Sequence, residues 1–303
     1  MNAVQCNAGK PRRPQRHPAL RIGVRWLAVT AVVIIPLWAT GCMERLFYHP
    51  TRAQTVPPPE AADAESVWFA SGDGTRLHGW LIPAADGTPR DRAATVLQVH
   101  GNAGNIESHL WFTEYLPAAG FNLFIFDFRG YGRSEGAARR RGPLIADTNA
   151  ALDMLLARAD IDPARIGMYA QSLGGAIGLN VMADRAELRS GLIMSSFSSW
   201  RDIAAAAVGG DPPGVVGRLL ARILIRDHDR PDEAIARIDR PILIIHGTDD
   251  EIVPASHGRR LADAGPTAEL MEIDGGDHNG LRASHPQIDR YVIEFFRRTL
   301  AEP

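Results

Sequence analysis

Cysteine and lysine are almost missing from this chain of 303 residues. The two cysteines, Cys6 and Cys42, both lie near the N-terminus, so the body that follows has no thiols for a disulfide framework or a thiolate metal site. Lys10 is the single lysine, and arginine supplies every other permanently cationic side chain. The chain also lacks the His-Glu-x-x-His string of zinc hydrolases, and we therefore expect no metal site.

Acidic side chains are absent from the first 41 residues, which carry six basic ones. Without that segment the chain has 27 arginines against 35 acidic residues, a net charge of −8. A mildly acidic body argues against nucleic-acid binding. Its length and composition suit one globular α/β domain of about 250 residues.

Residues 26–41 form an uncharged, mostly apolar run behind a positive flank, which predicts an export signal or a membrane anchor. The string Ala39-Thr40-Gly41-Cys42 is similar to the lipobox of bacterial lipoproteins, in which the cysteine is lipidated and becomes the new N-terminus. We interpret residues 1–41 as a signal peptide with lipidation at Cys42, and an uncleaved anchor is the alternative. Both interpretations place the body in the bacterial cell envelope, attached to a membrane on its extracytoplasmic, periplasmic face.

Residues 42–64 have the composition of a tether, although residues 47–50 interrupt it and are expected to dock on the body. From residue 65 to 303, apolar strands alternate with helical patterns, which predicts an α/β fold with a mostly parallel, doubly wound sheet. The expected strands are 66–70, 77–82, 94–100, 122–127, 166–171, 188–196, 241–246 and 268–273. Four helices are expected. The first follows the loop after the third strand and runs to about residue 119, the second covers 143–159, the third begins at 173, and the last covers 286–300.

Residues 197–239 separate two strands by more than an ordinary crossover. They contain an alanine-rich piece, a Gly/Pro break and an apolar piece at 215–225. We interpret this segment as a small helical cap inserted over the C-terminal edge of the sheet, because such long insertions are usually functional. The alternative is an extended crossover helix that only packs on the sheet.

Ser172 follows the strand at 166–171 and precedes a glycine-rich, apolar helical segment. At such a strand-turn-helix junction a serine is held in a strained conformation with its hydroxyl exposed above the sheet. The residues two before and two after it must be small, and here they are Ala170 and Gly174. The usual pattern is G-x-S-x-G, so Ala170 departs from it while meeting the same steric need.

A serine hydroxyl is a poor nucleophile until a base takes its proton, and the base needs an acid to orient it. In a parallel sheet the C-terminal ends of the strands share one edge, so the partners are expected just after later strands. Asp249 and Asp250 follow one such strand, and spacing does not choose between them. His278 lies in the glycine-rich loop after the last strand and is the candidate base. It competes with three histidines in strand or helix patterns, namely His246, His257 and His285.

The tetrahedral intermediate of acyl transfer carries an oxyanion, which needs two backbone N–H donors. Leu173, directly after the serine, is expected to supply one of them. The loop after the strand at 94–100 is expected to supply the other from Asn102, with Ala103 as the alternative. Glycines in this loop let its backbone approach a substrate.

With these residues assembled, the chain resembles the α/β-hydrolases, and among them the membrane-associated serine hydrolases of the ABHD and bud-emergence-protein type. The resemblance spans about residues 45–300. Its pattern H-G-x-x-D-x-x-V-P, which starts at His246, implies that Asp250 is the acid. The family implies hydrolysis of esters, thioesters or amides without a cofactor. The matching motifs are Leu46-Phe47-Tyr48-His49-Pro50, His100-Gly101-Asn102-Ala103-Gly104-Asn105, Asp127-Phe128-Arg129-Gly130-Tyr131-Gly132-Arg133-Ser134, Gln171-Ser172-Leu173-Gly174-Gly175, His246-Gly247-Thr248-Asp249-Asp250-Glu251-Ile252-Val253-Pro254 and Gly275-Gly276-Asp277-His278-Asn279.

These patterns predict a serine hydrolase that cleaves carboxyl-ester or thioester bonds of small acyl or lipid-like substrates through an acyl-enzyme. The apolar pieces of the cap favour such substrates, because a lid of that kind usually covers an apolar pocket. A peptidase or amidase of the same fold is one alternative, and a non-catalytic binding lipoprotein is another. Asp127 and Arg129 are expected to organise their loop as an internal hydrogen-bonded pair.

Overall fold

The structure is a computed structural model that describes residues 42–52 and 63–301. The predicted signal or anchor segment, residues 1–41, therefore lies outside the described residues, as do residues 53–62 of the predicted tether. In the part of the chain that is described, no helix is both long and apolar enough to cross a bilayer.

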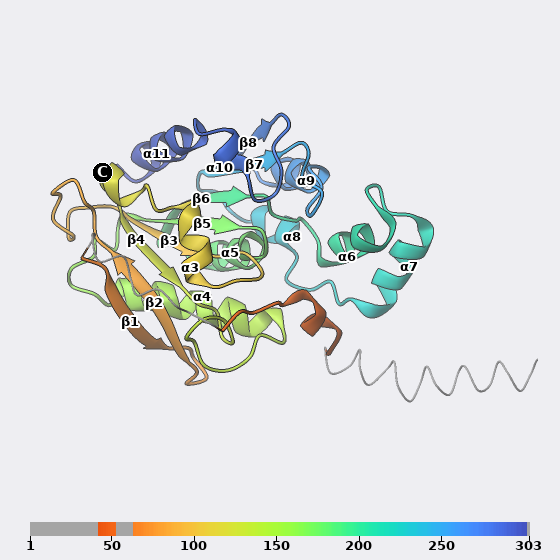
Figure 1. Cartoon of the computed structure of the whole chain (residues 1–303), viewed down its shortest axis with the longest axis horizontal. Helices are drawn as coiled ribbons and strands as arrows, with labels where there is room; N and C mark the ends of the chain where they lie inside the picture. The colour runs from red at the N-terminus through yellow and green to blue at the C-terminus, as the bar shows by residue number, and fades with distance from the viewer. Residues whose placement is uncertain (1–41, 53–62, 302–303) are drawn as a thin grey trace, which may run out of the picture. The chain divides into compact units, whose positions relative to one another are not determined.

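An eight-stranded sheet forms the centre of the molecule (Figure 1). Its first two strands pair antiparallel with their neighbours and all later neighbours are parallel, so the prediction of a mostly parallel, doubly wound sheet is confirmed. The spatial order is β1 (Glu65–Ala70), β2 (Arg76–Ile82), β4 (Asn122–Phe126), β3 (Thr95–Val99), β5 (Ile166–Gln171), β6 (Leu188–Met194), β7 (Ile242–Gly247) and β8 (Ala268–Ile273).

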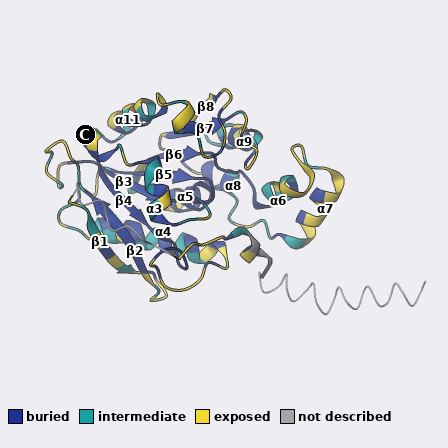
Figure 2. Ribbon diagram, viewed as in Figure 1, coloured by how far each residue is buried: buried dark blue, intermediate teal, exposed yellow. Residues whose placement is uncertain are grey.

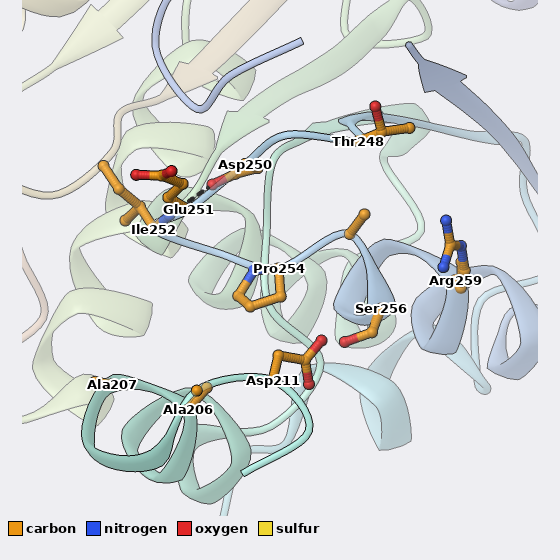
Figure 3. A pocket seen from close by; sticks show the side chains of 12 residues that line it. Ala206, Ala207, Asp211, Thr248, Asp250, Glu251, Ile252, Pro254, Ser256 and Arg259 are labelled. Atoms are coloured by element: carbon orange, nitrogen blue, oxygen red, sulfur yellow. Dashed lines mark hydrogen bonds between the residues drawn. The ribbon is translucent and has the colours of Figure 1, made fainter. Parts of the chain in front are cut away.

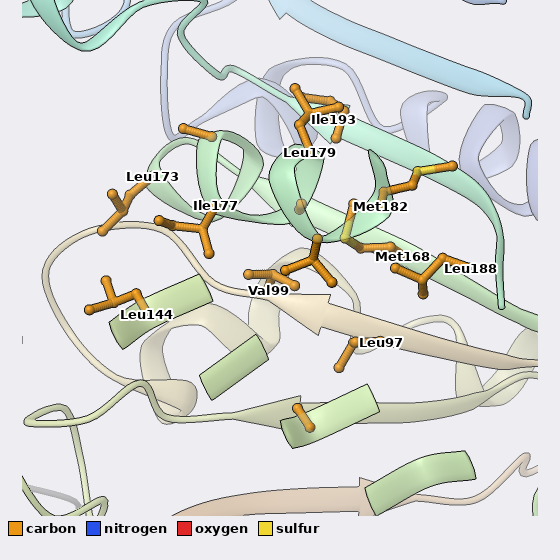
Figure 4. Packing of buried hydrophobic residues seen from close by; sticks show 14 of the residues in the cluster. Leu97, Val99, Leu144, Met168, Leu173, Ile177, Leu179, Met182, Leu188 and Ile193 are labelled. Atoms are coloured by element: carbon orange, nitrogen blue, oxygen red, sulfur yellow. The ribbon is translucent and has the colours of Figure 1, made fainter. Parts of the chain in front are cut away.

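Helices cover both faces of this sheet, and side chains alternate between two cores along each strand. In β3, Leu97 and Val99 point to one core and Val96 points to the other. Figure 4 shows the first core, which contains Leu97 and Val99 of β3 together with Leu144 and Ile177. That face carries α4 (Arg141–Leu156), α5 (Leu173–Asp184), α8 (Pro231–Ile235) and α9 (Ser256–Ala264), and the opposite face carries α3 (Ile106–His109), α10 (Leu281–Ser284) and α11 (Ile288–Thr299).

The helix expected from 105 to 119 is broken into α3 and two 3₁₀ turns, η4 (Leu110–Phe112) and η5 (Pro117–Ala119). The fully buried Gln98 explains the break after α3. Its Nε2 donates to the His109 carbonyl oxygen over 2.7 Å, and its Oε1 accepts from the Thr113 hydroxyl. The Thr113 amide bonds instead to the Leu110 carbonyl, as in a 3₁₀ turn.

The insertion at 197–239 contains α6 (Trp200–Gly209), α7 (Val215–Leu224) and α8. α8 packs against α5 and α9 and therefore belongs to the layer that covers the sheet. α6 and α7 instead pack on each other, at the edge of the molecule in Figure 1. They approach so closely that a Cβ at Gly217 would lie 2.7 Å from the Ala205 carbonyl oxygen. The helical hairpin α6–α7 is therefore the part of the insertion that stands apart from the sheet.

Residues 42–52, which the sequence assigns to a tether, lie against the body and begin with the 3₁₀ helix η2 (Cys42–Phe47). The Tyr48 side chain is buried, and the Phe47 ring meets the Trp200 ring edge-on with centroids 5.6 Å apart. Glu44 is also buried and forms an ion pair with Arg141. The docking expected at residues 47–50 thus extends back to residue 44.

Candidate active site

Ser172 lies at the sharp turn between β5 and α5, where its φ of 52° and ψ of −116° are unusual for a residue with a side chain. Its amide donates to the Met194 carbonyl oxygen of β6 over 2.9 Å. A Cβ at Gly174 would collide with the Val99 carbonyl oxygen, so only glycine fits there. Ala170 is fully buried and fits in place of the usual glycine.

The structure brings Ser172, His278 and Asp250 together at the C-terminal edge of the sheet, as the sequence predicts. The Nε2 atom of His278 lies 3.1 Å from the Ser172 hydroxyl oxygen. The Nδ1 atom of the same ring lies 2.7 Å from Asp250 Oδ2. All three residues are less than 9% exposed, with Ser172 the most accessible at 8%. This arrangement can pass a proton from the serine to the imidazole while the carboxylate holds the ring in place.

Asp250, rather than Asp249, contacts His278. Burial raises the pKa of Asp250, but hydrogen bonds involving His246, His278 and the Val253 amide outweigh it and hold this pKa well below its usual value. The Val253 amide donates to Asp250 Oδ1 over 2.7 Å. Asp249 instead faces the Thr248 hydroxyl, 3.3 Å away, at an exposed position.

His246, which was expected to lie within a strand and apart from the site, is also part of it. It does lie in β7, but its Nε2 is 2.8 Å from the Val253 carbonyl oxygen and 3.4 Å from Asp250 Oδ2. The ring is fully buried and supports the turn that carries Asp250. The spacing of four residues between His246 and Asp250 in the H-G-x-x-D pattern was the available signal.

The two predicted oxyanion donors lie in the first turn of α5 and in the loop between β3 and α3. Leu173 is the first residue of α5, so its amide is one of those that a helix cannot satisfy internally. The Asn102 side chain fixes the other loop, because its Oδ1 accepts from the His49 amide over 3.0 Å and from the Tyr131 hydroxyl over 2.8 Å. Its Nδ2 donates to the Phe47 carbonyl oxygen, so the N-terminal segment helps to hold this loop.

The prediction that Asp127 and Arg129 pair with each other is wrong, although both organise their loop. Arg129 points away from Asp127 and forms ion pairs with Asp147 and Asp73, each with an N–O distance of 2.6 Å. The buried Asp127 accepts from the Ile106 amide over 3.0 Å, which ties this loop to the start of α3. Arg129 therefore joins the loop to α4, and Asp127 joins it to the loop that carries Asn102.

A cavity of about 470 Å³ lies between the cap and the loop that carries Asp250 (Figure 3). Its walls include Ala206 and Ala207 of α6, and Asp211 of the turn between α6 and α7. The carboxylates of Asp211 and Glu251 and the guanidinium of Arg259 make the lining of this cavity partly charged, whereas an apolar pocket was expected. Among the described residues, no group of three or more His, Cys, Asp or Glu side chains is placed to hold a metal ion.

Comparison with known proteins identifies the family. The family model "Serine aminopeptidase, S33" matches residues 90–228, and the model "TAP-like protein" matches residues 224–302. The α/β hydrolase domain-containing protein WAV2 of Arabidopsis thaliana is 35% identical over 71% of this chain and 72% of its own length. This chain is an α/β-hydrolase.

Other relatives agree with this assignment. Protein YfhR of Salmonella typhi is 37% identical to this α/β-hydrolase over 84% of the chain and 86% of its own length. Protein bem46 of Schizosaccharomyces pombe is 29% identical over 75% of this chain and 77% of its own length. The resemblance to the bud-emergence type is therefore confirmed. The solved Pyrococcus furiosus esterase Pf2001 is 21% identical and superposes with a TM-score of 0.68 over 84% of this chain and all of its own, which shows the shared fold.

Proposed function

We propose that this α/β-hydrolase is a serine hydrolase that cleaves carboxyl-ester or thioester bonds through an acyl-enzyme. The observation that carries the proposal is the hydrogen-bonded chain from the Ser172 hydroxyl through His278 to Asp250, with distances of 3.1 and 2.7 Å. It combines a nucleophile, a base and an orienting acid in one buried cluster. The strained backbone at Ser172 supports the same assignment, because strain of this kind accumulates at functional sites.

In the proposed reaction Ser172 attacks the acyl carbon while His278 Nε2 takes its proton. Asp250 holds the Nδ1–H and stabilises the imidazolium that forms. The amides of Leu173 and Asn102 stabilise the oxyanion of the tetrahedral intermediate. The imidazolium then returns its proton to the leaving alcohol or thiol, and a water molecule releases the acyl group by the reverse sequence.

A peptidase is the second candidate, and a feature of the cavity favours it. The carboxylates of Asp211 and Glu251 line the cavity beside Asp250 and outnumber its one guanidinium, that of Arg259, so they suit the positive amino group of a peptide N-terminus. The alanines of α6 on the same cavity wall suit a short acyl chain instead. The two substrate classes therefore need a direct comparison.

A hydrolysis series separates these candidates. We expect the chain to turn over p-nitrophenyl esters, from acetate to long chains, faster than aminoacyl-nitroanilides. Ser172→Ala is expected to lower kcat by about 10⁴-fold or more. Turnover of the anilides alone would establish the peptidase. If neither substrate class is turned over and a fluorophosphonate does not label the protein, the result would favour the non-catalytic binding protein.

We also propose that the protein is attached to the extracytoplasmic face of a bacterial membrane through lipid on Cys42 or through the run at 26–41. The apolar run and the small residues before Cys42 support this location. Labelling of growing cells with radioactive palmitate is expected to mark the protein, and Cys42→Ser is expected to lose the label. Membrane retention of an unlabelled wild type would favour the uncleaved anchor.

A further inference from the structure

The outer face of α7 is made of large apolar side chains that are exposed to solvent. Val215, Val216 and Leu219 are 74%, 68% and 57% exposed, and Leu220 and Ile223 follow at 41% and 48%. At about 100° per residue these five positions fall on one side of the helix. Figure 2 shows this outer side of α7 largely in the colour of exposed residues.

The side of α7 that faces α6 presents small residues. Gly217 and Ala221 are buried against α6, so the contact between the two cap helices uses little side-chain volume. A soluble helix normally places its large apolar residues inside. In α7 the larger apolar area faces outward, which is typical of a surface that binds a partner.

The charges of α7 indicate the chemistry of that partner. The sequence of the helix, Val215–Leu224, contains Arg218 and Arg222 and no acidic residue. Both arginines are exposed, and their spacing places them along one flank of the apolar face. An amphipathic helix with an apolar face and flanking arginines is the pattern that lies in the headgroup region of a bilayer with anionic lipids.

The base of the cap lies where the N-terminal apolar run joins the domain. The run at 26–41 ends at Cys42, the first residue of η2. Arg141, which is fully buried, pairs with Glu44 of η2 over 3.1 Å. It also donates to the carbonyl oxygens of Arg226 over 2.8 Å and His228 over 2.6 Å, directly after α7. The first described residues therefore lie beside the C-terminal end of α7, and attachment of the chain at Cys42 would bring a membrane close to this end of the cap.

We propose that the apolar face of α7 docks on the surface of an anionic bilayer, as a second membrane contact beside the N-terminal segment. The α6–α7 turn lines the cavity next to Asp250, so docking would place that cavity close to the lipid surface. The inference rests on the proposed membrane attachment and not on the proposed hydrolysis. A binding measurement therefore tests it separately from any activity assay.

The test uses the full chain reconstituted into vesicles of equal parts phosphatidylcholine and phosphatidylglycerol. Cys6 and Cys42 are kept, so that either form of the N-terminal attachment is preserved, and a noncanonical amino acid that carries an NBD fluorophore replaces Leu219 on α7. The matched control carries the same fluorophore in place of Glu294, an exposed position of α11. We expect doxyl-labelled lipids to quench the fluorophore at 219 and not the one at 294. Replacing Arg218 or Arg222 by Gln is expected to lower the ratio of lipid-quenched to unquenched fluorophore about fivefold for each arginine.

Three results would overturn the proposal. The first is equal and weak quenching at 219 and 294 on vesicles that carry the protein. The second is failure of the protein to float with the vesicles. The third is a blue shift of the fluorophore at 219 that grows with protein concentration without lipid, since a second copy of the chain would then cover the face.

Discussion

At the scale of single residues, the turn at Ser172 shows how backbone and side chains specify one another. The positive φ of this serine stores about 1–3 kcal/mol of strain. The hydrogen bond from its amide to the Met194 carbonyl oxygen and the start of α5 at the next residue hold Ser172 in this conformation. The same turn brings Gly174 against β3, where space for a side chain is lacking.

A pair of substitutions tests this packing. Gly174→Ala is expected to lower the free energy of unfolding by about 3 kcal/mol, because its Cβ would collide with the backbone of Val99 and neither strand nor helix can move freely. Ala170→Gly restores the usual small residue and is expected to cost about 1 kcal/mol. Urea unfolding measures both changes. Equal stability of Gly174→Ala and the wild type would show that β3 yields to the added methyl group.

The acid of the site offers a matched test between neighbouring residues. Asp250→Asn is expected to lower kcat by about 10⁴-fold, because an amide favours the wrong histidine tautomer. Asp249→Asn should stay within a few-fold of the wild type, since Asp249 faces Thr248 at an exposed position. Ester hydrolysis under saturating substrate compares the two. The reverse order of effects would mean that the loop rearranges when substrate binds.

At the scale of elements, a buried ion pair between Glu44 and Arg141 helps to hold η2 to the domain. Glu44→Ala leaves Arg141 buried without its carboxylate partner, and breaking a buried pair in this way costs about 3 kcal/mol or more. Glu135→Ala is the control, because Glu135 and Arg76 form a solvent-exposed pair at 3.7 Å. The control is expected to change stability by about 0.5 kcal/mol at most. Similar stabilities of the two variants would contradict the docking of η2.

The strands could be predicted from sequence because parallel strands that are buried on both faces are mostly apolar runs, and β5, which is buried along its whole length, has the predicted bounds. The helix expected after Asn105 could not, since the residue that breaks it, Gln98, lies in the preceding strand. The same reason explains the wrong Asp127–Arg129 pair. The partners of Arg129, Asp73 and Asp147, are distant in sequence, and local spacing carries no information about them.

The candidate site was predicted more completely than its surroundings. Ser172, His278 and Asp250 each follow a strand, and the topology of a parallel sheet brings strand ends together. The role of the cap was harder to predict, because hydrophobic periodicity does not tell which side of a helix is covered. The apolar residues of α7 were expected over a pocket, whereas the structure exposes them.

At the scale of the whole molecule, folding disfavours the charged form of two buried histidines, His257 and His100. Burial, followed by the charge of Arg260, lowers the pKa of His257 to about 3. The Ser198 amide and the Arg260 guanidinium both donate to its Nδ1, so this atom cannot carry a proton in the native state. Burial, followed by the proximity of His109, likewise lowers the pKa of His100 to about 3.

These lowered pKa values predict a loss of stability in mild acid. The unfolded chain takes up protons on both rings near pH 6.5, whereas the folded chain does not, so the free energy of unfolding falls as the pH falls below that value. Each ring contributes a slope of about 1.4 kcal/mol per pH unit between about pH 6 and 4.5. His257→Gln removes one titrating ring and should make the slope shallower by that amount. Urea unfolding of wild type and variant at several pH values measures the difference, after both have been shown to fold at pH 7.5. If the free energy of unfolding falls equally steeply with pH in the wild type and the variant, His257 already takes up a proton in the folded protein over this pH range.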